Sequence, residues 1–306
     1  FARRTQNDAM LIGFQGSSYF SSTLNSLVSD FYEKYGMKGS RVNYCFDGAT
    51  PVTAAFLANR YMLYTLDRGY DNIFELADTE GELYLYKNNY ALPFGYMITE
   101  TPDTELDSLF VSAEYMRENI HEDDDDDDDL NPIERQNRLV HKLGISEDVF
   151  IPVDINLYGA DGDLYAPESA HYYAYTSNTK IDDIEMNYEG KSKTFSQIKK
   201  KYILDLGYHS EGEVLNFSSK NDESLNLSAY KIDTDVLDKF ITKLRGRTLT
   251  VSDYSQTKLT GSINVSTAGQ LVMSVAYEPG WTLLVDGKKA DMQLFEDTFI
   301  SVYLDE

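Results

Sequence analysis

The alternation of apolar and polar residues near the end of the chain is the feature that most constrains its fold. Residues 271–275 and 282–286 alternate with a period of two, which is the pattern of strands with one buried face. Asp286-Gly287 follows, and because glycine accepts the positive φ of a tight turn, this pair predicts a β-hairpin. A further apolar strand is expected around Phe299. We therefore expect this end of the chain to fold as paired strands.

Composition predicts that the chain lies in water rather than in lipid. Of its 306 residues, 42% are apolar and 25% are charged, and the mean hydropathy is −0.42. No apolar run approaches the roughly 18 to 20 residues that a membrane-spanning helix needs. The sequence begins at Phe1 without a charged and then apolar leader, and it stops just after a strand, so we interpret it as a segment of a longer protein.

Charge and length exclude some classes of function. The formal net charge of −24 and the pI near 4.4 argue against nucleic-acid binding, because the chain offers no basic stripe that could displace counterions from phosphates. The same charge would repel an anionic polymer. The length suits two cores of ordinary size. The single cysteine, Cys45, cannot form an internal disulfide and is expected to be a buried thiol.

Residues 1–100 predict a mixed α/β domain. Met10–Phe14 is expected to be a strand, and Ser21 and Ser22 are expected to cap a helix that ends at Gly36. Thr50-Pro51 opens a second helix, since proline is tolerated in a first helical turn. Strands are expected over 61–66, 72–76 and 82–87, the last two joined as a hairpin.

Residues 101–149 are expected to be a connector. His121-Glu122 is followed by seven consecutive aspartates, 123–129. Consecutive carboxylates repel one another instead of converging on a calcium ion, so this run is expected to be a disordered, solvated loop. Asn131-Pro132 then predicts the cap and first turn of a helix that ends at Gly144.

Residues 150–306 predict a β-sandwich domain, which we expect to be jelly-roll-like. Strand patterns recur with turn residues between them, over 172–175, 181–188, 202–206, 214–217, 225–232, 248–251 and 259–265. One inserted helix, capped by Asp233 or Thr234 and closed by Gly246, is expected to plug one end of the sandwich. The predicted fold class is therefore α+β, with an N-terminal mixed α/β layer followed by this sandwich.

A series of motifs runs through the chain in a fixed order. They are Asn7-Asp8, Gly13–Gly16, Tyr19–Asn25, Phe56–Tyr61, Tyr86–Tyr96, Asn131–Asn137, Tyr277, Gly280-Trp281 and Asp286–Lys288. In this order they resemble the extracytoplasmic domain of the YfhO-type bacterial integral membrane protein family. The resemblance covers nearly the whole chain, although residues 150–270 match only as a strand pattern. The acidic run and Asp161-Gly-Asp163 depart from the family pattern.

The resemblance implies a polytopic, GT-C-like membrane glycosyltransferase. Such a protein would transfer a sugar from a polyprenyl-phosphate donor to a cell-wall or lipoteichoic polymer. The catalytic acid of that architecture lies near the first membrane helices, so this segment is expected to be accessory and non-catalytic, on the extracytoplasmic side of a bacterial cell membrane. Its expected partners are the membrane-embedded remainder of the same chain and a cell-wall glycan or lipoteichoic acid.

The residues themselves predict no catalytic group, cofactor or metal ligand in this segment. The sequence contains no nucleotide, zinc or serine-hydrolase motif. The four histidines, His121, His141, His171 and His209, are scattered and are expected at the surface. Asp182-Asp183 would point to opposite faces of a strand, which argues against a glycosidase pair.

Two groups of residues are candidates for substrate binding. The first is a polar cluster near the start of the chain, made of Asn7, Asp8, Tyr19, Ser22 and Asn25. Helix capping by Ser22 explains part of that cluster equally well. The second group is the aromatic pair Tyr277 and Trp281, which suits stacking on a sugar ring, with packing in the core as the alternative.

An alternative function is a carbohydrate-binding or adhesive cell-surface module without enzymatic activity. Such a module would itself bind a wall glycan, and it would lose affinity on Trp281→Ala. An accessory segment of a transferase would instead transfer no sugar when isolated.

Overall fold

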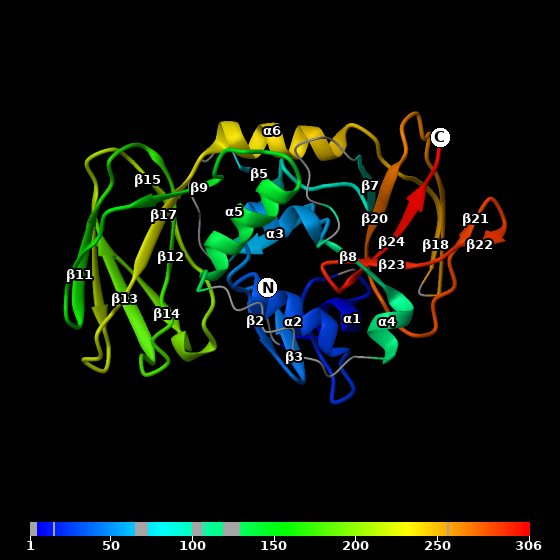
Figure 1. The fold of residues 1–306 in the computed structure, drawn as a ribbon. Coiled ribbons are helices and arrows are strands. Elements are labelled where there is room, and N and C mark those ends of the chain that lie inside the picture. The colour runs from blue at the N-terminus through cyan, green and yellow to red at the C-terminus, as the bar shows by residue number, and fades with distance from the viewer. Residues whose placement is uncertain are drawn as a thin grey trace.

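The computed structural model describes residues 5–14, 16–64, 73–99, 106, 108–118, 129–255 and 257–306. Figure 1 shows these residues arranged as successive layers, with a β-sandwich at one side, helices in the middle and a further sheet at the other side. Three hydrophobic cores fill the space between the layers. We call them the sandwich core, which lies between the two sheets of the sandwich, the central core, which surrounds the helices, and the terminal core, which lies against the further sheet.

Two antiparallel sheets form the sandwich. The outer sheet has the strand order β10-β11-β16-β13-β14, and the inner sheet has the order β15-β12-β17-β9. The strands are β9 (Phe150–Val153), β10 (Asn156–Tyr158), β11 (Asp161–Tyr165), β12 (Ala170–Tyr175), β13 (Asp183–Tyr188), β14 (Lys191–Ser196), β15 (Leu204–His209), β16 (Val214–Ser219) and β17 (Ser228–Ile232). Both sheets contribute apolar side chains to the sandwich core, as expected for aligned sheets that pack face to face.

The inner sheet is buried on both of its faces. Successive side chains of a strand point to opposite faces, so Tyr172 of β12 enters the sandwich core while Tyr173 enters the central core. Both tyrosines are 0% exposed. Phe150 and Tyr230, on the neighbouring strands, also contribute to the central core. The inner sheet is therefore a wall shared by the sandwich and the helices.

Four helices fill the middle layer: α2 (Ser26–Lys34), α3 (Pro51–Phe56), α5 (Pro132–Lys142) and α6 (Thr234–Arg245). Local sequence explains where they begin and end. Asn131 caps α5 in a reciprocal capping box with Glu134, and Gly144 at φ 81° follows its last turn. Thr50 and Thr53 form a similar box at the start of α3, and Pro51 occupies the first turn of that helix.

The terminal sheet closes the central core from the other side. Its order is β7-β20-β24-β23-β8, and its strands are β7 (Gly95–Ile98), β8 (Phe110–Ser112), β20 (Gly269–Ala276), β23 (Gln293–Phe295) and β24 (Phe299–Leu304). This sheet also has two buried faces, because Val272 enters the central core while Leu271 and Met273 enter the terminal core. Strands from residues 95–112 and from residues 269–304 thus share one sheet.

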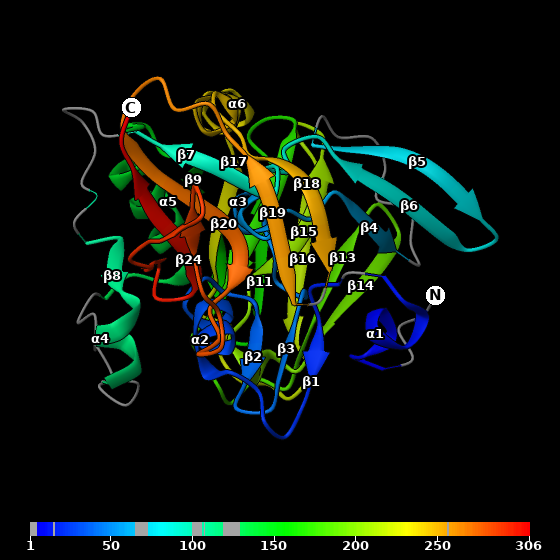
Figure 2. The ribbon, with the colours of Figure 1, turned by 90° about the vertical axis from the view of Figure 1, so that its right-hand side faces the viewer.

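Smaller elements surround these layers. They are α1 (Asp8–Ile12), β1 (Tyr19–Phe20), β2 (Lys38–Ser40), β3 (Asn43–Cys45), β4 (Tyr61–Tyr64), β5 (Phe74–Glu80), β6 (Leu83–Asn88), α4 (Ala113–Glu118), η1 (Ile198–Lys200), β18 (Thr250–Ser255), β19 (Lys258–Ser262), β21 (Leu284–Val285) and β22 (Lys288–Lys289). In Figure 2 the β5–β6 hairpin projects from one side of the molecule. Asp286 and Gly287 have φ of 50° and 75° between β21 and β22, which confirms the predicted hairpin turn.

The structure confirms an α+β fold that is mostly strand, and it confirms the predicted helices over α3, α5 and α6. The jelly-roll-like connectivity stays a prediction. Two local predictions were wrong. The first three residues of Met10–Phe14 belong to helix α1 in place of a strand, and α2 is capped by Asn25 and not by Ser21 or Ser22. The Asn25 side chain accepts a hydrogen bond from the Leu27 amide, so it satisfies a donor of the first turn.

The sandwich is smaller than the predicted range of 150–306. Its two sheets end at β17, whereas β20, β23 and β24 pair with β7 and β8 of the earlier part of the chain. Helix α6 does not plug the sandwich, because its buried side chains, including Leu237 and Phe240, belong to the central core. Most of the acidic run, residues 121–128, lies outside the described residues.

The packing of α6 can be tested with Phe240→Ala. Phe240 is 0% exposed and its ring lies 5.9 Å from that of Phe56, so truncation leaves a cavity in the central core. We expect the free energy of unfolding to fall by about 3–5 kcal/mol in chemical denaturation. Phe14→Ala is the matched control, since Phe14 is 57% exposed and its loss should change stability by only about 0.5 kcal/mol. An equally small effect of Phe240→Ala would contradict this packing.

Candidate functional site

The first predicted group splits into two places. Asn7 precedes α1 and holds the backbone of Phe20 with both ends of its amide, accepting from the Phe20 N–H at 2.7 Å and donating to its carbonyl at 3.0 Å. The Asp8 carboxylate accepts hydrogen bonds from the Thr5 amide and hydroxyl at 2.9 and 2.8 Å. Tyr19 lies on β1, with its ring 6.1 Å from that of Tyr44. These side chains connect α1 to the small sheet formed by β1, β2 and β3.

The structure brings Asn25 together with the predicted aromatic pair. The Asn25 Nδ2 donates to the Tyr277 carbonyl at 2.5 Å, while its Oδ1 accepts from the Leu27 amide at 3.1 Å. Tyr277 is buried in the terminal core, and Trp281 is half-buried against the same core. Ser22 lies exposed in the turn before α2. Asn25 thus joins α2 to the segment that follows β20, and binding of a substrate by any of these residues stays a prediction.

A cation-rich hollow lies between α2, α5 and the turn that joins β23 to β24. It is lined by Lys34, Tyr35, Arg135, Arg138, Leu139, Lys142 and Glu296. Glu296 is 8% exposed, and its Oε2 accepts from the Tyr35 hydroxyl at 2.6 Å and lies 2.9 Å from the Lys34 Nζ. Removing a carboxyl group from water is costly unless it is paired and hydrogen-bonded, and Tyr35 and Lys34 supply these partners for Glu296. The cluster ties the two helices to the terminal sheet.

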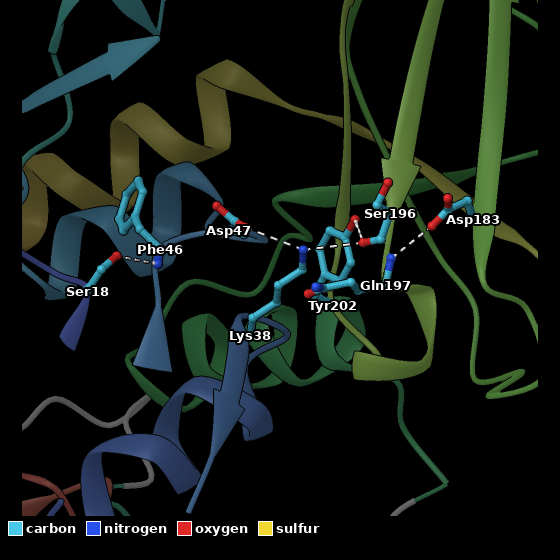
Figure 3. A network of polar contacts seen from close by, with 8 residues as sticks. All are labelled: Ser18, Lys38, Phe46, Asp47, Asp183, Ser196, Gln197 and Tyr202. Carbon is cyan, nitrogen blue, oxygen red and sulfur yellow. Dashed lines mark hydrogen bonds and ion pairs between the residues drawn. The ribbon is translucent and has the colours of Figure 1, made fainter. Parts of the chain in front are cut away.

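A polar network joins β2 and β3 to the sandwich. In Figure 3, Lys38 of β2 reaches between Asp47 and the segment that follows β14. Its Nζ lies 3.4 Å from the Asp47 carboxylate, 3.3 Å from the Ser196 carbonyl and 4.0 Å from the centre of the Tyr202 ring. Burial, followed by the negative charges of Asp47 and Asp183, raises the pKa of Tyr202, whose hydroxyl donates to the Ser196 carbonyl. These contacts hold the layers together.

Two histidines expected at the surface are buried. His171 and His209 are each 2% exposed. His171 Nε2 lies 2.6 Å from the Asp205 carboxylate, and His209 Nδ1 lies 3.2 Å from that of Glu213. His141 is at the surface, as predicted, and His121 lies outside the described residues. Cys45 is buried, as predicted.

An open hollow on the outer sheet was not among the predicted sites. It is lined by Tyr158, Asp161, Gly162, Asp163, Asn187, Asn216, Phe217 and Ser218. In the sequence, Asp161-Gly-Asp163 stands out only as a departure from the family pattern. The signal for this face is the polar half of each alternating strand, because it lies opposite the apolar half that enters the core.

The described residues offer neither a clustered metal site nor a membrane-spanning helix. Among these residues, no group of three or more His, Cys, Asp or Glu side chains could hold a metal ion together. None of the helices in the described ranges has the length and apolarity required to cross a membrane.

Comparison with known proteins identifies the family. The family model described as bacterial membrane protein YfhO matches residues 1–306. The chain belongs to the YfhO family of bacterial membrane proteins. No curated protein and no solved structure matches it.

Several residues of the motifs that the chain shares with YfhO-type proteins hold this fold together. Phe56 and Tyr96 are each 1% exposed in the central core, where burial raises the pKa of Tyr96. Asn131 caps α5 and also donates to the Tyr230 hydroxyl of the inner sheet at 2.7 Å. Burial raises the pKa of Tyr230 to about 12, with the hydrogen bond to Glu134 acting in the same direction. These motif residues stabilise the arrangement of the layers.

Asn25 allows the structural and substrate-binding interpretations to be separated. We expect Asn25→Ala to lower the free energy of unfolding by about 1–2 kcal/mol, because it removes both the cap of α2 and the bond to Tyr277. Asn25→Ser keeps a cap acceptor and should recover part of that loss, as measured by chemical denaturation. If Asn25→Ala left stability unchanged but weakened binding of a glycan, the structural interpretation would be refuted.

Proposed function

We propose that this chain is an extracytoplasmic segment of a glycosyltransferase-like YfhO protein and that the segment is accessory to catalysis. In this proposal the membrane-embedded remainder transfers a sugar from a polyprenyl-phosphate donor to a cell-wall or lipoteichoic polymer. The segment holds the membrane part in place or shapes the side on which the acceptor enters. Membership of a family of bacterial membrane proteins supports the membrane location.

One observation carries the accessory role. The polar side chains of the family motifs form hydrogen bonds within the chain itself. Asn7 bonds to Phe20, and Asn25 bonds to Leu27 and Tyr277. Asn131 bonds to the first turn of α5. A side chain that forms the transition-state contacts of a transfer reaction has to direct its polar group towards substrate. Residues that hold backbone segments together are suited instead to maintain the shape of a rigid body.

A transfer assay tests this proposal. The purified 306-residue chain is incubated with a polyprenyl-phosphate hexose and lipoteichoic acid, and membranes that contain the whole parent protein are assayed in parallel. We expect labelled sugar on the polymer only with the parent protein, because the catalytic acid is proposed to lie in the membrane-embedded part. Transfer by the isolated chain would contradict the accessory role, and no transfer by the parent from the polyprenyl-phosphate donor to lipoteichoic acid or another cell-wall polymer would contradict the glycosyltransferase function.

A carbohydrate-binding or adhesive module is the second candidate. The pair Tyr277 and Trp281 gives this candidate little support, because both side chains pack against the terminal core in place of offering a free surface to a sugar ring. The open hollow on the outer sheet supports it instead, since hydroxyl, amide and carboxylate groups gather there beside an exposed tyrosine.

A further inference from the structure

The outward face of the outer sheet carries two cross-strand rows of polar residues. Pairing of five neighbouring strands places Asn156, Asp163, Asn216, Asn187 and Ser192 in one row. The same pairing places Tyr158, Asp161, Ser218, Glu185 and Thr194 in the next row. Each row crosses four gaps between strands, which is about 19 Å at the usual strand spacing. The rows lie beside one another because their members are two residues apart on every strand.

The composition of the first row contradicts strand propensity. Asn and Asp are depleted in strands, where β-branched and aromatic residues are favoured. Here three asparagines and one aspartate occupy successive positions across β10, β11, β16 and β13. An ordinary solvated sheet face does not require asparagines at matched positions on three of its strands. A local rule broken in this way is expected at a functional site.

The two rows lie open to solvent. Figure 1 places the outer sheet at the edge of the molecule, on the side of the inner sheet away from the helices. Asn187 and Asn216 are exposed, and Tyr158 at the end of the second row is 65% exposed. A hollow of about 300 Å³ lies over the rows, with walls from β10, β11, β13 and β16.

The groups in the hollow match a ligand that is rich in hydroxyls. Carboxylates accept hydrogen bonds, and amides both donate and accept them, which are the complements of sugar hydroxyls. Asn156 already donates to Asp163 at 2.9 Å, so the row includes a preorganised acceptor. Desolvation, and then the charge of Asp163 and a hydrogen bond to it, raise the pKa of Tyr158. The Tyr158 ring offers an apolar surface for the C–H face of a sugar.

We propose that the outward face of the outer sheet is a binding site for a neutral oligosaccharide chain, with Asn187, Asn216 and Asp163 as its central hydrogen-bonding groups and Tyr158 as its stacking platform. The acidic groups Asp161 and Asp163, on a chain of net charge −24, select a neutral glycan over a phosphate-bearing polymer by electrostatic repulsion. The site rests on the second candidate function, carbohydrate binding, and is independent of the proposed transferase role, since it requires no donor lipid and no transfer.

Isothermal titration and saturation-transfer NMR on the 306-residue chain test this site. The probes are maltotetraose, cellotetraose, laminaritetraose and chitotetraose, each titrated to about 10 mM, and polyglycerol phosphate is the anionic comparison. We expect at least one neutral tetrasaccharide to bind with a millimolar or lower Kd and the polyanion not to bind. Failure of all four to bind, or tighter binding of the polyanion, overturns the site.

Variants locate the binding surface. We expect the double variant Asn187→Ala/Asn216→Ala and the single variant Tyr158→Ala each to weaken binding about tenfold or more, while thermal unfolding confirms that each variant is folded. Tyr303→Ala is the matched control, because Tyr303 is an exposed strand tyrosine, 51% accessible, on the terminal sheet. Binding that survives the double variant, or that is lost on Trp281→Ala or Tyr303→Ala instead, overturns the assignment to the outer sheet.

Discussion

The central core depends on two sheets that are each buried on both faces. On one side, β12 directs Tyr172 into the sandwich core and Tyr173 into the central core. On the other side, β20 directs Val272 into the central core and its neighbours Leu271 and Met273 into the terminal core. The four central helices bury their apolar stripes between these walls. Since interiors are close-packed, neither wall can shift without opening a cavity in two cores at once.

This arrangement explains which surfaces remain for function. The helices, the inner sheet and the terminal sheet use their side chains to fill cores, and the YfhO motif residues fix the junctions between them. The outward face of the outer sheet meets no other layer among the described residues, and it carries the polar rows of the proposed glycan site. This chain thus presents one open, polar sheet face.

Local chemistry made part of this fold predictable. The cap at Asn131, the Asp286-Gly287 turn and the strands β13 and β16 each depend on neighbouring residues, and each was predicted correctly. The strand predicted over Met10–Phe14 was wrong because a short apolar run has no period that separates strand from helix. The pairing of β7 with β20 was not predicted, because the two strands lie far apart in sequence and alternation gives a strand's buried face but not its neighbour. The polar rows were missed for the same reason, since strand order is what assembles them.

The central claim is that the layers form one cooperative body. Chemical unfolding followed with two probes tests it most directly: the fluorescence of Trp281, the only tryptophan, reports on the terminal core, and pulsed hydrogen exchange of β13 and β16 reports on the sandwich. Shared walls predict that both probes give one transition with the same midpoint. A sandwich that kept its amide protection after the Trp281 signal had fully changed would contradict the account.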